Sequence, residues 1–353
     1  MTERGKYIYG IINSNTSLHL SIPTDFLVGK SESNGVYTIP YQDISALVRD
    51  SEIVEYTGMR KDALARLLIG HQTVIERIMT PQTTIIPVRL GTYALDETEV
   101  KEILNKGYNL IKHIFEKISD KIEIDVAATW SNFNLIVKEV GEQKEIKEFK
   151  VRLLAEPKGI TVEDQMKVGV MVKKALDERR EKYAQEIQEA LKTVSPDFKT
   201  HELMDDKMVV NIVLLIDKDK REGFDKKVEE LNVKFNEKLN FRCVGPLPPY
   251  SFFTLEIKKM RFNDVAWARK RLGILNDAIS KDEIKKIFQR QAFVTHPDKN
   301  PDRPEAEKEF DEIKKSYQIL LDYAYSCEQG GRESIIFNED EFQKNAILVK
   351  VRD

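Results

Sequence analysis

The clearest pattern in the chain lies in SKDEIKKIFQRQAFVTHPDKNPDRPEAEKEFDEIKKSYQILLD, residues Ser280 to Asp322. Apolar residues recur every three or four positions before His296 and again after Pro304, which is typical of two amphipathic helices. Ser280 is followed three positions later by Glu283, a capping-box pair that predicts where the first helix begins. The sequence therefore predicts a helical hairpin.

The tripeptide His-Pro-Asp at residues 296–298 lies between the two predicted helices. Proline disfavours helical geometry in the residue before it, so the first helix is expected to end at His296. A metal site would need further ligands at set spacing, and none of the other four histidines lies within eighty residues. Nucleophilic catalysis would need a nearby Ser or Cys with an oriented base. A purely structural loop or a protein contact therefore remains.

Residues Asn263 to Tyr325 closely resemble a J-domain, the module through which co-chaperones of the Hsp40 class engage Hsp70. The sequence HPDKN at 296–300, its flanking hairpin and RLGIL at 271–275 carry the resemblance. It implies a contact with Hsp70 through the loop and through basic residues of the helix before it. The implied contact residues are His296, Pro297, Asp298, Lys285, Lys286 and Arg290.

The segment also departs from the J-domain pattern. Gln289 and Val294 stand where basic residues are common, Thr295 where an aromatic residue is usual, and Gln291 where a core leucine is usual. Losing charges at the rim of an interface chiefly lowers the association rate. These differences imply a weaker or more selective contact with Hsp70.

Composition limits the classes of function. The chain has 353 residues and a net charge of -3, which suggests two or three domains and no basic excess for binding nucleic acid. The longest apolar run, Met208 to Ile216, is too short to span a bilayer, so no membrane segment is predicted. Cys243 and Cys327 match no metal or redox spacing, and no phosphate loop or export signal is visible, so we expect a cytoplasmic protein without metal or cofactor.

The N-terminal part is predicted to be an α+β domain over residues 1–138. Strands at 6–13, 83–92, 121–130 and 133–137 alternate with helices at 60–79 and from 96 onward, which favours a modified ferredoxin-like sheet. His71 lies close to the apolar stripe of the first helix. We expect it to be packed and bonded to a neighbour rather than catalytic.

A second α+β domain is predicted over residues 139–260. Its long helix, 162–194, begins at the Thr161–Asp164 capping pair and joins the two ferredoxin-like units. Strands at 198–204, 208–216, 241–244 and 251–257 and a helix at 223–239 suggest a β-α-β-β-α-β order. The J-domain-like segment, 261–327, follows. In the tail, 328–353, Ala346 to Val351 alternates like a strand that could return to the second sheet, which would make the hairpin an insertion.

Residues from Lys6 to about Lys259 resemble the GvpL/GvpF family of gas vesicle proteins. KYIYGI, IPYQDISALV, the spacing of His71 to IIPVRLGT, and FRCVGPLPPYSF carry the resemblance. From their residue types these motifs are structural: Gly245, Pro246, Pro248 and Pro249 rigidify a turn before Tyr250. Arg89, next to Gly91, could bond carbonyls of that turn, which we favour, or a partner's carboxylate.

The two resemblances together imply a cytoplasmic assembly factor, or minor component, of gas vesicles. It would bind the hydrophobic shell protein and other gas vesicle proteins, and its J-domain-like hairpin would recruit Hsp70. An enzyme is disfavoured because no catalytic constellation assembles from the sequence, and no catalytic residue is predicted. The alternative is a purely structural vesicle constituent, in which the hairpin is only a docking arm.

Overall fold

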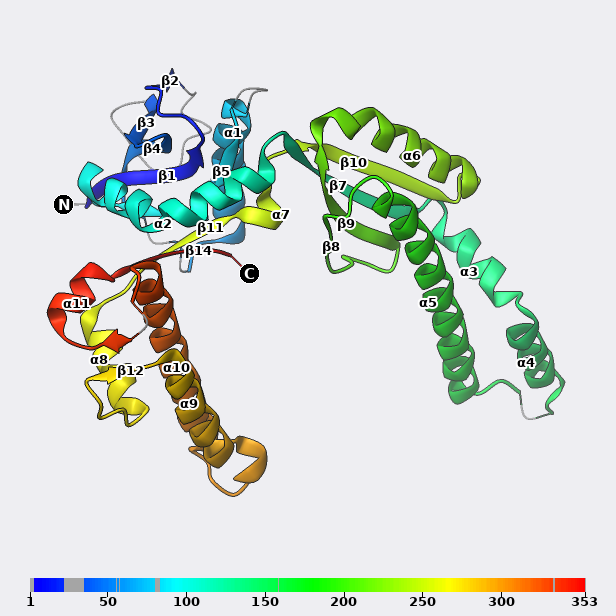
Figure 1. The fold of residues 1–353 in the computed structure, drawn as a ribbon. Helices are drawn as coiled ribbons and strands as arrows, with labels where there is room; N and C mark the ends of the chain where they lie inside the picture. Colours follow the sequence, from blue (N-terminus) through cyan, green and yellow to red (C-terminus); the bar gives the residue numbers. More distant parts are fainter. Residues whose placement is uncertain are drawn as a thin grey trace. The chain divides into compact units, whose positions relative to one another are not determined.

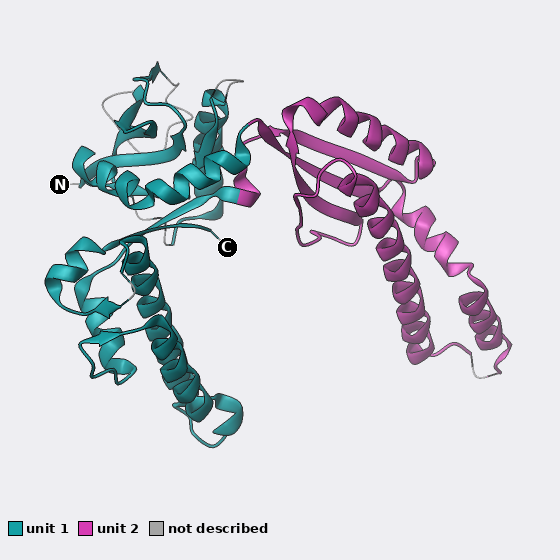
Figure 2. Cartoon of the chain, viewed as in Figure 1, with its two compact units in different colours: residues 1–119, 253–353 teal, residues 120–252 magenta. Residues whose placement is uncertain are grey.

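The computed structural model describes residues 3–21, 35–54, 56, 58–79, 83–157, 159–332 and 334–352 (Figure 1). Two compact units form: unit 1 comprises residues 1–119 and 253–353, and unit 2 comprises residues 120–252 (Figure 2). Within those described ranges, no helix is both long and apolar enough to cross a membrane. The predicted α+β class is confirmed.

Unit 1 contains an antiparallel sheet. Its strands are β1 (Arg4–Ile12), β2 (His19–Ser21), β3 (Gly35–Tyr41), β4 (Ile44–Glu52), β5 (Ile85–Pro87) and β6 (Tyr93–Ala94). They lie in the order β2-β3-β4-β1-β5, and β6 also pairs with β1. Helix α2 (Glu97–Ile118) buries its apolar stripe, whereas α1 (Lys61–Ile78) buries only the part from Gly70 onward and exposes Leu64 and Leu68. This order is not the ferredoxin-like order that we predicted for the first domain.

Unit 2 has the ferredoxin-like arrangement. Its elements are β7 (Lys121–Trp130), α3 (Phe133–Gly141), α4 (Lys144–Ala155), α5 (Val162–Lys192), β8 (Phe198–Thr200), β9 (Met208–Asp217), η2 (Lys218–Lys220), α6 (Arg221–Lys234) and β10 (Leu239–Leu247). The sheet runs β10-β7-β9-β8, so its strands lie in the order fourth, first, third, second. One face of this sheet packs with the helices around a single hydrophobic core.

Three expectations for this region were wrong. Residues 133–137 form part of helix α3, because the Asn132 side chain accepts a hydrogen bond from the Leu135 N–H and caps a helix there. Strand β7 pairs with β9 and β10, so it belongs to unit 2, and the boundary predicted at residue 138 falls inside α3. Helix α5 buries Ile187 and Leu191 in the core of unit 2 and therefore lies within that unit instead of joining two units.

The chain then returns to unit 1 through α7 (Tyr250–Phe253) and β11 (Leu255–Lys259), so the strand predicted at 251–257 starts later. Strand β14 (Ile347–Val351) pairs antiparallel with β11. The returning strand is confirmed, although it pairs with β11 and not with the four-stranded sheet. Everything between the two paired strands is therefore an insertion.

The insertion holds the predicted hairpin. Its elements are α8 (Phe262–Arg271), β12 (Ala278–Ile279), α9 (Lys281–Thr295), η3 (Pro297–Lys299), α10 (Ala306–Gln329), β13 (Ile335–Ile336) and α11 (Glu339–Lys344). Ser280 and Glu283 form the expected capping box at the start of α9. Ile284 of α9 and Ile313 and Leu320 of α10 are buried in one core, so the hairpin is a packed module.

Candidate functional site

The His-Pro-Asp loop joins α9 and α10 at the end of the hairpin farthest from β14 (Figure 1). The backbone N–H of Asp298 donates to Nδ1 of His296 at 3.2 Å, and the His296 ring lies edge to face with Phe310, with centroids 5.0 Å apart. The Asn300 amide donates to the carbonyls of Val294 at 2.8 Å and His296 at 3.0 Å. The loop is thus ordered by its own residues.

This geometry leaves two polar groups for a partner. Because Nδ1 of His296 accepts a hydrogen bond, the neutral ring carries its proton on Nε2. The side chains of His296 and Asp298 are 43% and 89% exposed. The loop offers a donor and a carboxylate side by side, which suits recognition of a protein surface. Within the described ranges, no cluster of His, Cys, Asp or Glu could hold a metal ion.

Helix α9 presents the predicted basic residues to solvent. Lys285, Lys286 and Arg290 are exposed, and none of them forms an ion pair with a described carboxylate. Near the loop this face becomes apolar, since Phe293 is 66% and Val294 is 62% exposed.

The other two departures from the J-domain pattern are accommodated inside the hairpin. The Gln291 amide donates to the carbonyl of Leu272 at the end of α8, at 2.8 Å. The Thr295 hydroxyl donates to the Gln291 carbonyl at 2.9 Å. Both polar groups are therefore satisfied, and α9 keeps its packing against α10.

A chain of ion pairs fixes α10 to the strands that flank the insertion. Lys258 of β11 lies 2.8 Å from Asp322 of α10, and Lys350 of β14 lies 3.6 Å from Asp322 and 3.8 Å from Glu256. Glu256 also pairs with Arg89. Arg89 thus binds an internal carboxylate rather than the carbonyls that we expected. This chain, together with the hydrogen bond from the Ser326 hydroxyl to the Ile347 carbonyl at 2.7 Å, fixes one end of the hairpin.

The GPLPPYS segment (245–251) is anchored by a carboxylate that sequence reasoning missed. Ser251 donates to Glu123 of β7 from its N–H at 2.9 Å and from its hydroxyl at 3.0 Å. Burial raises the pKa of Glu123 to about 7. Gly245 has a φ of 155°, and a Cβ there would lie 2.8 Å from the Glu123 carbonyl oxygen. Glu123 alternates with apolar neighbours as an exposed strand residue would, so the sequence carried no signal for it.

The structure places the other predicted motif residues in structural roles. Pro246 follows Gly245 near the end of β10, and Pro248 and Pro249 precede Tyr250, where α7 begins. Gly91 has a φ of 85°, and a Cβ there would lie 2.8 Å from the Tyr56 ring.

His201 and Ser251 do not form a catalytic pair. Nε2 of His201 lies 3.4 Å from the Ser251 hydroxyl, which already donates to Glu123. The carboxylate therefore holds the serine and does not orient the histidine, which differs from the arrangement of a nucleophilic triad.

His71 is packed, as its position on the helix predicted. Its Nδ1 accepts from the Tyr7 hydroxyl at 2.7 Å, and its Nε2 donates to the Val88 carbonyl at 3.0 Å. Burial lowers the pKa of His71 to about 4, so the ring is neutral at pH 7. His71 thereby ties α1 to the strands of unit 1.

Comparisons with known proteins place these two regions in families. Residues 5–254 match the family model described as gas vesicle synthesis protein GvpL/GvpF. The chain belongs to the GvpL/GvpF family. Residues 270–325 match the DnaJ domain, so this family member carries a DnaJ domain inserted between β11 and β14.

Relatives support both assignments. Gas vesicle protein F of Nostoc sp. is 24% identical over 70% of this chain and 97% of its own length. Gas vesicle protein F2 of Halobacterium salinarum is 22% identical over 73% and 95%. The crystal structure of GvpF from Anabaena sp. aligns with a TM-score of 0.56 at 24% identity, over 70% of this chain and 97% of that one, which supports the fold. Chaperone protein DnaJ of Salinibacter ruber is 49% identical over 51 residues, which are 14% of this chain and 13% of that protein.

Proposed function

We propose that this GvpL/GvpF protein assists gas vesicle assembly in the cytoplasm. In this proposal it binds the hydrophobic shell subunit and recruits an Hsp70-type chaperone through its DnaJ domain. It acts by binding and has no enzymatic activity of its own. A shell subunit can bury its apolar surface only after it polymerises, so before assembly it is an aggregation hazard that needs an escort.

The observation that carries the proposal is the position of the His-Pro-Asp loop. The loop lies at the free end of the DnaJ hairpin, with His296 and Asp298 exposed. The opposite end of α10 is fixed to β11 and β14 through Asp322. A chaperone bound at the loop would therefore be held at a set position relative to β11 and β14.

Replacing His296 by glutamine is expected to abolish the stimulation of ATP hydrolysis by Hsp70. The side chain is half-exposed, so the substitution should cost less than about 1 kcal/mol of folding stability. Single-turnover ATP hydrolysis by the cognate Hsp70, with and without each protein, measures the effect. Lys308→Gln, an exposed change on α10, is the matched control and should stimulate as the wild type does. Equal stimulation by His296→Gln and the wild type would remove the chaperone part of the proposal.

The basic face of α9 should contribute electrostatically. Lys286→Glu together with Arg290→Glu is expected to weaken Hsp70 binding at least fivefold in low salt, because both side chains are exposed and Hsp70 would meet reversed charges. Salt screens such contacts, so the difference from the wild type should shrink as ionic strength rises. Binding measured by surface plasmon resonance over a salt series tests this. A difference that does not change with salt would show that these residues act through packing.

The alternative is that the protein is only a structural part of the vesicle, with the DnaJ hairpin as a docking arm. Shell-subunit solubility distinguishes the two roles. In the proposed role, co-production with this chain raises the soluble fraction of the shell subunit. No rise, combined with stoichiometric retention in purified vesicles, would favour the structural role.

A further inference from the structure

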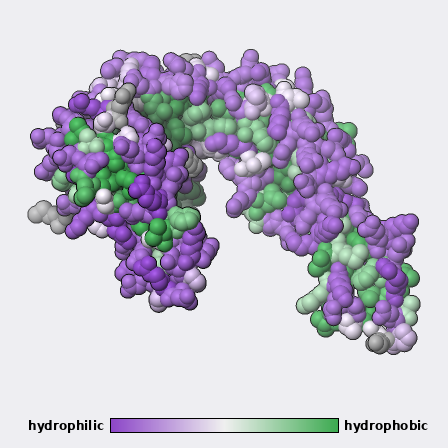
Figure 3. All heavy atoms as spheres, turned by 60° about the horizontal axis from the view of Figure 1, so that its bottom comes forward, coloured by the Kyte–Doolittle hydropathy of each residue, from purple (hydrophilic) through white to green (hydrophobic). Residues whose placement is uncertain are grey.

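Helix α5 exposes an apolar stripe at its N-terminal half. Val162, Met166 and Val170 are 69%, 67% and 68% exposed, at spacings of four residues. Apolar surface gathers at this end of α4 and α5 in Figure 3. The opposite side of α5 at this level of the helix is buried, because Met171, Val172 and Ala175 pack in the core of unit 2. The stripe is therefore a second apolar face of the same helix.

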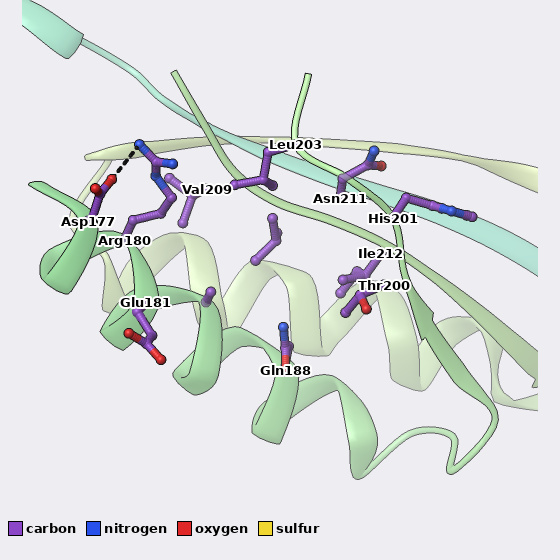
Figure 4. Close-up of a pocket in the computed structure, with 12 residues that line it drawn as sticks. Asp177, Arg180, Glu181, Gln188, Thr200, His201, Leu203, Val209, Asn211 and Ile212 are labelled. Atoms are coloured by element: carbon purple, nitrogen blue, oxygen red, sulfur yellow. Dashed lines mark ion pairs between the residues drawn. The ribbon is translucent and has the colours of Figure 1, made fainter. Parts of the chain in front are cut away.

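The C-terminal half of α5 borders a groove of 370 Å³ (Figure 4). Ala184 and Gln188 of α5 form one wall, and Val209 and Ile212 of β9 lie across from them. Strand β8 is three residues long, but the chain after it stays beside β9, because the His201 N–H donates to the Asn211 carbonyl at 2.8 Å. Val209 and Ile212 are buried, and Leu203, which also lines the groove, is 38% exposed. The groove is thus bordered by α5 and by the segment that follows β8.

The stripe and the groove lie on the same face of α5. Eighteen residues are about five turns of an α-helix. Met166 and Ala184 are eighteen positions apart, as are Val170 and Gln188. The two residues of each pair therefore project from the same side of the helix, about five turns apart. A segment laid along this face would cover the stripe and continue into the groove.

The charges of the groove indicate what kind of segment would fit. Asp177 and Glu181 line it together with one guanidinium, Arg180. Arg180 is already shared, at 3.3 Å from Asp177 and 3.7 Å from Asp206, and Asp177 also lies 3.7 Å from Lys173. Exposed Glu181 has no ion-pair partner within the described residues. Glu181 is therefore the carboxylate of the groove that a basic residue would complement.

We propose that this face of α5, from Val162 to Gln188, is a docking surface for an apolar polypeptide segment that carries a basic residue. This inference rests on the proposed function, and the segment that docks there belongs to the shell subunit before assembly. A second copy of this chain fits less well. Three aliphatic side chains present on the order of 300 Å² of apolar surface, whereas a stable dimer buries roughly 800 Å² on each partner. The smaller area of this surface suits a shell subunit that binds only transiently.

The test uses the full chain with Val162→Gln, Met166→Gln and Val170→Gln combined. Glutamine is a good helix former, so α5 should remain intact. The probe is a short fluorescein-labelled peptide of Ala, Leu and Lys, with a counterpart in which Glu replaces Lys. Fluorescence anisotropy is expected to show at least tenfold weaker binding of the Lys peptide to the triple variant. Glu181→Lys alone should weaken the Lys peptide and strengthen the Glu peptide.

The matched control is Leu64→Gln, Leu68→Gln and Ile69→Gln on α1, where the exposed fractions are 38%, 43% and 57%. It should bind both peptides as the wild type does. Equal affinity of the wild type and the α5 triple variant, or an equal loss in the α1 control, would overturn the docking surface. Self-association of the wild type that the α5 variant abolishes in sedimentation would also overturn it, because the occupant would then be a second copy.

Co-production with the shell subunit separates this inference from the proposed function. If the wild type raises shell-subunit solubility and the α5 variant does not, both are supported. If the two proteins raise it equally, the docking surface is wrong and the proposed function stands. If the wild type has no effect, the proposed function fails, and the peptide measurement alone decides whether α5 is a docking surface.

Discussion

Lowering the pH from 7 to 4 should destabilise unit 1 by about 3 kcal/mol through His71 alone. The folded protein holds this ring neutral, with a pKa of about 4, whereas an unfolded histidine has a pKa of 6.5. The unfolded state therefore binds the proton first. The stability contributed by the neutral ring is present above pH 6.5 and is lost as the pH falls through 4.

The physical cause is the environment of the ring. His71 is 3% exposed, and both of its nitrogens are already used by the Tyr7 hydroxyl and the Val88 carbonyl. A second proton on the ring would prevent Nδ1 from accepting the bond that Tyr7 donates and would place a charge in the buried core of unit 1.

Urea unfolding at several pH values measures this loss. The chain has two tryptophans, and Trp130→Phe leaves only Trp267, which lies in unit 1, as the fluorescent reporter. In that background His71→Gln should lose most of the dependence between pH 4 and 6.5. His113→Gln, an exposed change on α2, should keep it. An unchanged pH dependence in His71→Gln would show that other groups cause the loss.

Features that depend on residues close together in the chain could be predicted from the sequence. The DnaJ hairpin, its capping box and the loop at His296 follow from apolar spacing and one proline within a single stretch of chain. The apolar stripe of α1 likewise predicted that His71 would be packed. Each of these signals compares residues a few positions apart. The resulting helices bury most of their apolar stripes, although the N-terminal half of α1 exposes Leu64 and Leu68.

Pairing between distant strands was not predictable in the same way. The alternation in β7 shows that it is a strand but not which sheet it joins, so it was assigned to the first domain. Residues 133–137 are apolar enough for a strand, and only the Asn132 cap distinguishes the helix. The strand pair β11–β14 joins positions about ninety residues apart, which periodicity does not encode.

The same distinction between local and long-range features applies to the candidate site. His296 and Asp298 were found because the motif is contiguous. The Arg89–Glu256 pair, the Glu123–Ser251 pair and the groove beside α5 were missed, because each depends on contacts between segments far apart in the chain. Charged residues are common on surfaces, and only the fold shows that Glu123 and Glu256 are buried.

Unit 2 should respond to pH in the opposite direction, through Glu123. This carboxyl is 1% exposed, and burial raises its pKa to about 7 from an ordinary value of 4.5. Between these values the folded state holds a proton that the unfolded state has released. The stability contributed by the neutral form is therefore fully present below pH 4.5 and is lost as the pH rises through 7, by about 3 kcal/mol in total.

Glu123→Gln is expected to remove this loss and to make unit 2 more stable than the wild type at pH 8. Glutamine is neutral. Its amide oxygen can accept from the Ser251 N–H and its amide NH2 can donate to the Ser251 hydroxyl, so it keeps the anchor of the GPLPPYS segment without a buried charge. In a Trp267→Phe background, Trp130, which is 4% exposed in unit 2, reports the unfolding of that unit in urea. Asp219→Asn, which changes an exposed carboxylate, is the matched control and should follow the wild type at every pH. If Glu123→Gln lost stability between pH 4.5 and 8 as steeply as the wild type, Glu123 would not titrate with folding. The pH dependence of unit 2 would then have to come from other carboxyls, such as Asp125, whose pKa is also raised by burial.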